Sequence, residues 1–380
     1  MNFDFTAEEN ELKRRVAGVF TGEAVSEAQL MERASLEELK RTTGDFLRKL
    51  GEIGYLSLCL GPAQASESLK LLAAQEDVAR ISGSLFLSVE TTARLFGGLV
   101  AGFGAHDQFS DLLALLAGGR IIAAVAVSED ERPDSGPGFS TVAWEDGESF
   151  IVSGTKPFVT NAPIADYIAV AASLDGKPAI FIVKPGDHAV VVGPRLETLG
   201  YNGLAVASLE LREVRVPKEM VIGPLQNPTL IEFLRRTQDL LLTAASVGLM
   251  RRTLTESKKH ADSHLRGGKP IFARQEIRFK IAEMLTLTQT AQLLCYRAAW
   301  MYSVSDAEAH AVLHCAKVFS AEASERVASM GVQILAGTGY VSGNPVEQAY
   351  RESKYAALAG TTTELARMSI AEELLKRHQV

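Results

Sequence analysis

The sequence has little of what marks disulfide-rich, membrane-spanning or nucleic-acid-binding proteins. Its 380 residues contain three cysteines, Cys59, Cys295 and Cys315, too few and too widely spaced for a disulfide framework or a CxxC zinc site. Lys and Arg number 39 against 46 Asp and Glu. Because no basic run offsets the net charge of -7, we predict no nucleic-acid partner. No stretch of about 20 consecutive apolar residues occurs, so we predict no membrane span.

Composition and N-terminus are those of a globular protein of a reducing compartment. Hydrophobic residues make up 47% and charged residues 22%, as in ordinary folded domains. The opening residues, MNFDFTAEENELKRRV, carry charge from the start and lack an apolar signal core, so we predict a cytoplasmic protein. The chain is longer than the roughly 100–200 residues of one domain, so we expect two or three packed units.

Residues 1–118 have the pattern of a helical domain. Thr6 followed by Glu9 supplies a helix cap and a first-turn acid. Leu12 and Val16 then fall at helical spacing, and similar apolar runs follow. We predict an N-terminal α-helical domain over this range.

Residues 119–225 have the residue pattern of β-strands and turns. Short β-branched runs alternate with clusters of Gly, Pro, Asp and Ser, and no long helical pattern separates them. This favours a middle antiparallel β-domain or barrel over a Rossmann unit, and no GxGxxG follows a strand. The predicted strands cover 121–127, 149–152, 167–171, 179–183, 190–192 and 208–216.

Residues 226–380 return to helix. Long Ala- and Leu-rich amphipathic segments are separated by glycine-containing breaks, and helices of about 30 residues packed side by side predict a four-helix bundle. The predicted helices cover 230–262, 274–302, 306–336 and the residues from 346 onward. The fold class is therefore α+β, with domains at 1–118, 119–225 and 226–380.

Two histidine pairs have a spacing that can serve a metal. His260 with His264, and His310 with His314, are four residues apart on predicted helices. Neither pair has the Glu of HExxH or a third ligand nearby in sequence, so we predict no metal site. A GxSxG elbow is also absent, which argues against a serine hydrolase.

Several short motifs lie along nearly the whole chain. They are SGTKPFVTN (153–161), LGYNG (199–203) with VRVP (214–217), GKPI (268–271) with Gln275, residues 316–340, and YRESK (350–354). In this order and at these distances they resemble NGxKxFITN, LGxrgs…VxVP, GkpIxxfQ, AKxxas…QxxGGxGY and yRDak, the motifs of the acyl-CoA dehydrogenase superfamily.

The resemblance implies FAD held between the middle domain and the C-terminal bundle, with help from a neighbouring subunit. It implies α,β-dehydrogenation of an acyl-CoA or other acyl thioester, with an electron-transfer flavoprotein or another acceptor, in a homotetramer or a heterotetramer. Backbone groups and hydroxyls would bond the isoalloxazine edge while Phe158 covers its face. The FAD contacts that the resemblance predicts are Val127, Ser128, Phe158, Thr160, Arg266, Gln275, Gln333, Gly337 and Thr362.

The catalytic carboxylate departs from the family pattern. Most members place a Glu directly before the Gly-Thr of yEGTseIqr, and here alignment puts Ala359 or Gly360 at that position. A minority carry the base on the first long bundle helix, which corresponds to Gln238 here. The neighbouring Asp239 would serve as the base if the helix were rotated by one residue, about 100°. Asp239 is therefore the predicted base, and Gln238 a predicted substrate contact.

Two flavin-binding segments depart as well. The family's TEPgaGSD loop is SEDERPDSG (128–136) here, and several of its small residues are replaced by charges. Ser135 recovers the serine with a one-residue shift and is predicted to contact substrate. His264 and Gly267 stand where the family has the Arg and Phe of R-x-x-F-G, which leaves Arg266 as the nearby cation. Acids in a flavin loop disfavour anionic groups unless they are paired.

These departures leave three functional interpretations. The first is an autonomous flavin-dependent acyl-CoA dehydrogenase. The second is a non-catalytic or half-catalytic subunit that works with a second acyl-CoA dehydrogenase-like chain. The third is a flavin oxidase or monooxygenase on the same fold, which needs no Glu at the position of Ala359 or Gly360.

Overall fold

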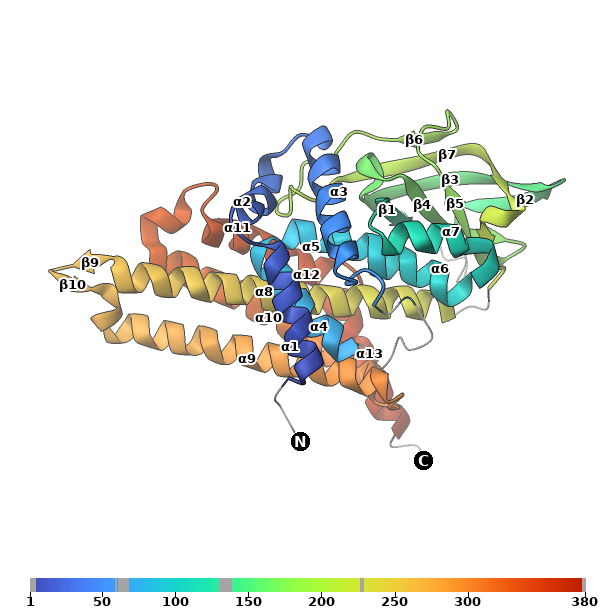
Figure 1. The fold of residues 1–380 in the computed structure, drawn as a ribbon. Helices are drawn as coiled ribbons and strands as arrows, with labels where there is room; N and C mark the ends of the chain where they lie inside the picture. The colour runs from blue at the N-terminus through green and yellow to red at the C-terminus, as the bar shows by residue number, and fades with distance from the viewer. Residues whose placement is uncertain (1–4, 59, 61–67, 130–138, 226–228, 378–380) are drawn as a thin grey trace.

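The N-terminal part of the chain is helical. The computed structural model describes residues 5–58, 60, 68–129, 139–225 and 229–377 (Figure 1). A capping box begins the first helix: Thr6 Oγ1 accepts from Glu9 N–H at 3.2 Å, and Glu9 Oε2 accepts from Thr6 N–H at 2.6 Å. The helices are α1 (Ala7–Val19), α2 (Glu23–Leu30), α3 (Leu36–Glu52), α4 (Ser68–Ile81), α5 (Gly83–Glu90), α6 (Gly97–Phe103) and α7 (His106–Ala117).

An eight-stranded sheet follows, in the order β6-β7-β3-β2-β4-β5-β8 with β1 paired to β4. Most neighbours are antiparallel, as predicted, but β4 pairs in parallel with both β1 and β2. The sheet is therefore mixed: β4 pairs in parallel with β1 and β2, and in antiparallel with β5. The strands are β1 (Ala123–Ala126), β2 (Val142–Asp146), β3 (Ser149–Thr160), β4 (Tyr167–Leu174), β5 (Lys177–Val183), β6 (Val190–Val192), β7 (Val206–Pro217) and β8 (Val221–Ile222).

A bulge in β3 sets the direction of Phe158. Lys156 pairs with Leu209 of β7 and Val159 with Ala207, so three residue steps on β3 oppose two on β7. Lys156 and Val159 consequently both point inward, although three positions separate them. Phe158 points outward and is 65% exposed.

Long helices make up the C-terminal part. Helices α8, α9 and α10 pack on one another, and α13 packs on α10. The hairpin of β9 (Leu265–Arg266) and β10 (Lys269–Pro270) joins α8 to α9 at the end of the bundle opposite the sheet (Figure 1). The helices are α8 (Thr229–Ser263), α9 (Gln275–Ser303), α10 (Ala309–Leu335), α11 (Pro345–Glu352), α12 (Tyr355–Leu358) and α13 (Thr363–Arg377).

Helix α8 also joins the bundle to the N-terminal helices. A side chain at Gly248 would place its Cβ 2.5 Å from Ala79 Cβ, so α4 and α8 approach each other more closely than a larger residue allows. Of the helices that the structure describes, none has both the length and the apolar composition of a membrane span.

Candidate active site

The end of β1 and the bulge of β3 bring four of the predicted FAD contacts into one region. Lys156 is the link, because its Nζ donates to Val127 O at 3.2 Å and so holds the chain after β1 against β3. Ser128 follows Val127 directly. Phe158 lies on the outward side of the β3 bulge, and Thr160 is the last residue of that strand.

The same lysine neutralises one acid of the predicted flavin loop. Glu129 Oε1 lies 2.7 Å from Lys156 Nζ and accepts from Thr141 N–H at 2.9 Å, while Oε2 accepts from the N–H and hydroxyl of Ser140 at 2.6 and 2.8 Å. Burial raises the pKa of Glu129, but the hydrogen bonds from Lys156, Thr141 and Ser140 outweigh it and hold that pKa well below its usual range. Glu129 is thus a paired structural acid.

The rest of that loop, residues 130–138, lies outside the described residues. This applies to Ser135, which the sequence predicts to contact substrate.

The two base positions predicted from the sequence lie side by side, although about 120 residues separate them in the chain. A Cβ at Gly360 would stand 2.5 Å from Asp239 Oδ1 and 3.5 Å from Gln238 Cγ. Helix α8 therefore presents its candidates directly to the segment formed by residues 359–361, which we call the Gly360 segment. Gln238 is half-buried, and Ala359 is half-buried.

Asp239 is buried and bound to the Gly360 segment. Its side chain is 1% exposed, and Oδ1 accepts from Thr361 N–H at 2.9 Å. Burial raises the pKa of Asp239, and Lys317 and the hydrogen bonds from Thr361 oppose that rise. Asp239 therefore turns into the bundle, against residues 359–361, and does not face solvent.

Lys317 of α10 completes this buried group. Its Nζ lies 3.6 Å from Asp239 Oδ1 and donates to Ala359 O at 2.7 Å. Burial lowers the pKa of Lys317 to about 8 against the opposing effect of Asp239. Lys317 was not among the functional residues predicted from the sequence. The available signal was a lysine on the apolar face of a helix, between the buried residues Leu313 and Ser320.

His314, one turn before Lys317, also faces Asp239. Its Nε2 lies 4.0 Å from Asp239 Oδ2, and burial together with His310 lowers the pKa of His314 to about 4. His314 is therefore neutral at pH 7. Among the described residues, no group of three or more His, Cys, Asp or Glu side chains is arranged to hold a metal.

The remaining predicted FAD contacts divide between two places. Thr362 follows the Gly360 segment and its Oγ1 accepts from Leu365 N–H at 3.3 Å. The others are exposed: Arg266 is on β9 and Gln275 begins α9, at the end of the bundle that Figure 1 shows far from the sheet, and Gln333 and Gly337 lie at the C-terminal end of α10. Within one protomer, these exposed residues therefore do not join the predicted FAD contacts around Phe158.

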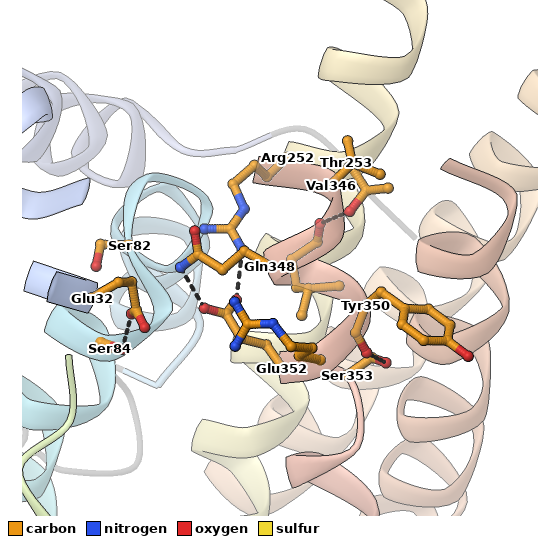
Figure 2. Close-up of polar contacts among 12 residues, drawn as sticks. Glu32, Ser82, Ser84, Arg252, Thr253, Val346, Gln348, Tyr350, Glu352 and Ser353 are labelled. Atoms are coloured by element: carbon orange, nitrogen blue, oxygen red, sulfur yellow. Dashed lines mark hydrogen bonds and ion pairs between the residues drawn. The ribbon is translucent and has the colours of Figure 1, made fainter. Parts of the chain in front are cut away.

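A second polar network holds α11 against the rest of the protein. Figure 2 shows Arg252 of α8 reaching Glu352, where its Nη2 lies 2.6 Å from Oε2, while Gln348 Nε2 donates to Glu352 Oε1 at 2.7 Å. Glu32, bonded to Ser84 and to a backbone N–H of the 200–203 turn, faces the same junction. The network fixes α11 and thereby the chain that leads to the Gly360 segment.

Comparison with known proteins agrees with this architecture. Family models of the acyl-CoA dehydrogenase middle domain and C-terminal domain match residues 124–214 and 239–375. The mitochondrial short-chain specific acyl-CoA dehydrogenase of Mus musculus is 27% identical over 345 residues, covering 88% of this chain and 83% of the relative. The CarC subunit of the caffeyl-CoA reductase-Etf complex of Acetobacterium woodii is 27% identical over 386 residues, covering 98% and 100%.

A solved structure shows the same fold. Acyl-CoA dehydrogenase complexed with FAD from Bacillus anthracis superposes with a TM-score of 0.87 at 24% identity, covering 99% of this chain and 68% of that one. Helical N- and C-terminal parts around a central sheet, matched over these lengths, define the class. The chain belongs to the acyl-CoA dehydrogenase superfamily, which confirms the resemblance and the fold class predicted from its motifs.

Proposed function

We propose that this chain is an FAD-dependent acyl-CoA dehydrogenase that acts on an acyl thioester. The observation that carries the proposal is Phe158, a large aromatic side chain left 65% exposed at a strand bulge beside the chain at Val127 and Ser128. A flat ring lying on Phe158 would remove this apolar face from water while polar groups nearby bond its edge. The residues present therefore fit an isoalloxazine.

In this proposal the protein binds and orients, and FAD when bound would supply the acceptor for the β-hydrogen, which leaves as hydride while the α-hydrogen leaves as a proton. Phe158 would cover one face of the ring, and Val127, Ser128 and Thr160 would bond its edge. Arg266, Gln275, Gln333 and Gly337 would serve the cofactor of a neighbouring protomer, because they lie on β9, at the start of α9 and at the C-terminal end of α10, and not beside Phe158. A homo-oligomer, or an assembly with a second chain of the family, follows from that division.

The reaction also needs a base for the α-proton, and here one observation favours a second candidate. Of Ala359, Gly360, Gln238 and Asp239, only Asp239 has a carboxylate, and it is 1% exposed with Oδ1 engaged by Thr361 and Lys317. A general base must reach the proton that it removes. This favours a subunit that binds FAD and relies on a partner chain for the carboxylate, over Asp239 acting alone.

The acyl-CoA substrate and the acceptor are part of the proposal. The acyl chain and thioester would lie against Gln238 and the Gly360 segment. An electron-transfer flavoprotein is the proposed acceptor; the CarC relative is a subunit of a complex whose name includes Etf.

The first experiment is the visible absorption spectrum of the chain purified alone, before and after a panel of acyl-CoAs is added. Flavin bands that bleach with an acyl-CoA mean an autonomous dehydrogenase. Flavin bands that persist, and bleach only after a second family chain is added, mean the partner-dependent form. A colourless protein that takes up no added FAD overturns the proposal.

A further inference from the structure

A buried ion pair spans the glycine at the proposed active site. Asp239 of α8 and Lys317 of α10 are each 1% exposed, and Asp239 Oδ1 lies 3.6 Å from Lys317 Nζ. Two charges removed from water are expensive unless they compensate each other and satisfy further polar groups. The further groups in this case belong to the Gly360 segment.

Each member of the pair binds the backbone on one side of Gly360. Lys317 Nζ donates to Ala359 O at 2.7 Å, and Asp239 Oδ1 accepts from Thr361 N–H at 2.9 Å. One side chain therefore satisfies the carbonyl before the glycine, and the other satisfies the amide after it. Together the two side chains hold the segment in one conformation.

The contacts made by Asp239 and Lys317 require a glycine at position 360. Its φ is 66°, a left-handed conformation that favours glycine, and a Cβ there would lie 2.5 Å from Asp239 Oδ1. The close approach of the carboxylate to the backbone thus depends on the missing side chain. Thr362, a predicted FAD contact, comes two residues later, so the pair also fixes where that residue stands.

We propose that Asp239 and Lys317 are positioning residues that clamp the Gly360 segment, and that Asp239 does not take the substrate proton. The inference rests on the proposed function for its link to FAD, while the clamp itself is a property of the chain. Because the two charges compensate each other, removing one of them should destabilise the segment more than removing both.

The test compares D239N, K317M and the D239N/K317M double variant with the wild type. Native-state hydrogen exchange of the Thr361 amide reports the clamp directly, and FAD titration reports its effect on the cofactor. Each single variant leaves a buried charge without its partner, so we expect Thr361 exchange to accelerate about tenfold or more and FAD to bind about tenfold more weakly. The double variant leaves no charge unpaired, and the amide oxygen at position 239 can still accept from Thr361 N–H, so it is expected to recover part of both losses.

An exposed ion pair with one member on α10 supplies the matched control. Glu325 of α10 lies 2.7 Å from Lys354 Nζ with side chains 41% and 52% exposed. E325Q and K354M are expected to change neither Thr361 exchange nor FAD affinity by more than about twofold, because exposed pairs contribute little.

Three results overturn the inference. The first is Thr361 exchange unchanged in both single variants, and the second is a double variant as impaired as the single variants combined. In the third, every variant binds FAD as the wild type does but in D239N and the double variant an acyl-CoA no longer reduces the flavin, which makes Asp239 the base. If a single variant does not fold, Thr361 exchange and FAD affinity of the double variant, each compared with the wild type, still test the clamp. A wild type that binds no FAD removes the proposed function, and the exchange data then decide the clamp alone.

Discussion

Lys156 and Glu129 form an ion pair across the start of the predicted flavin loop, with Nζ and Oε1 2.7 Å apart and side chains 0% and 4% exposed. The lysine comes from the inward side of the β3 bulge, and the same bulge turns Phe158 outward. One irregularity in a strand therefore both buries the pair that holds the loop and exposes the aromatic face proposed for FAD.

Removing only one member of this pair should destabilise the protein. K156M leaves Glu129 buried without its cation, so we expect a loss of about 3–5 kcal/mol in unfolding free energy and weaker FAD binding. The E129Q/K156M double variant should recover a large part of that loss. Urea unfolding followed by circular dichroism measures both.

The control for this prediction lies on β7. Arg212 and Glu210 form a pair at 2.8 Å with side chains 61% and 45% exposed. R212M should cost no more than about 1 kcal/mol. Equal losses in K156M and R212M would show that burial of the Lys156 pair has no energetic consequence.

Phe158 allows cofactor binding to be separated from folding. Since its side chain is 65% exposed, F158A should change the unfolding free energy by less than about 1 kcal/mol. Loss of an aromatic contact worth about 0.5–1.5 kcal/mol should weaken FAD binding roughly threefold to tenfold. Trp144 on β2, 42% exposed, is the matched aromatic, and W144A should leave FAD affinity unchanged. Identical affinities for F158A and wild type would refute the proposed stacking.

Placing a carboxylate in the Gly360 segment should be possible at one position only. Ala359 has φ -83° and ψ 154°, which any residue adopts, whereas Gly360 has φ 66° and faces Asp239 Oδ1. If the chain lacks an accessible base, A359E should accelerate flavin bleaching by an acyl-CoA about tenfold or more, within the range of general-base effects. Stopped-flow absorbance measures the rate.

G360A, which adds only a methyl group, is the comparison variant for A359E. We expect it to destabilise the fold by about 1–3 kcal/mol, because the new Cβ meets a buried carboxylate in a strained backbone conformation. Should A359E bleach no faster than wild type while binding FAD normally, the missing base would not be the factor that limits the chain.

Glu76 of α4 predicts a pH dependence of stability. It is buried, with Oε2 3.1 Å from Arg251 and 2.7 Å from Gln292 Nε2, and burial, opposed by Arg251, raises its pKa from 4.5 to about 7. The folded state thus holds this proton more tightly than the unfolded state does. The resulting stability is complete below pH 4.5 and is lost as pH rises through 7.

E76Q removes that titration. Compared with wild type, its unfolding free energy should improve by about 2–3 kcal/mol between pH of about 4.5 and 7.5, since each unit of pKa shift corresponds to about 1.4 kcal/mol. Urea unfolding at several pH values measures the difference. E76Q and wild-type curves that run parallel over this range would contradict a raised pKa.

Sequence patterns predicted the fold to the extent that local periodicity determines it. The capping box at Thr6, the three-part order and the long helices near α8, α9 and α10 follow from residues close together in the chain. The parallel pairing of β4 with β1 and β2 does not, because strand neighbours in a mixed sheet are chosen by packing.

Site residues that belong to sequence motifs could be predicted. Contacts between residues far apart in the chain could not. The motif around Phe158 identified an aromatic residue whose exposure the bulge then produced. The partners Asp239 and Lys317 are 78 positions apart on different helices, and their meeting requires the crossing of α8 and α10. The acidic loop was read as a repulsive feature because no sequence rule shows that Glu129 turns inward to Lys156.

Helix α8 has a consequence for how this chain can change over time. Its 35 residues span about 52 Å, and along them lie Asp239 beneath the Gly360 segment, Gly248 against α4 and Arg252 beside α11. A single helix that contacts both the N-terminal helices and the C-terminal segments cannot be removed or exchanged without exposing both. These parts are thus not interchangeable modules, and new specificity is accessible through substitutions within this architecture, not through recombination of its parts.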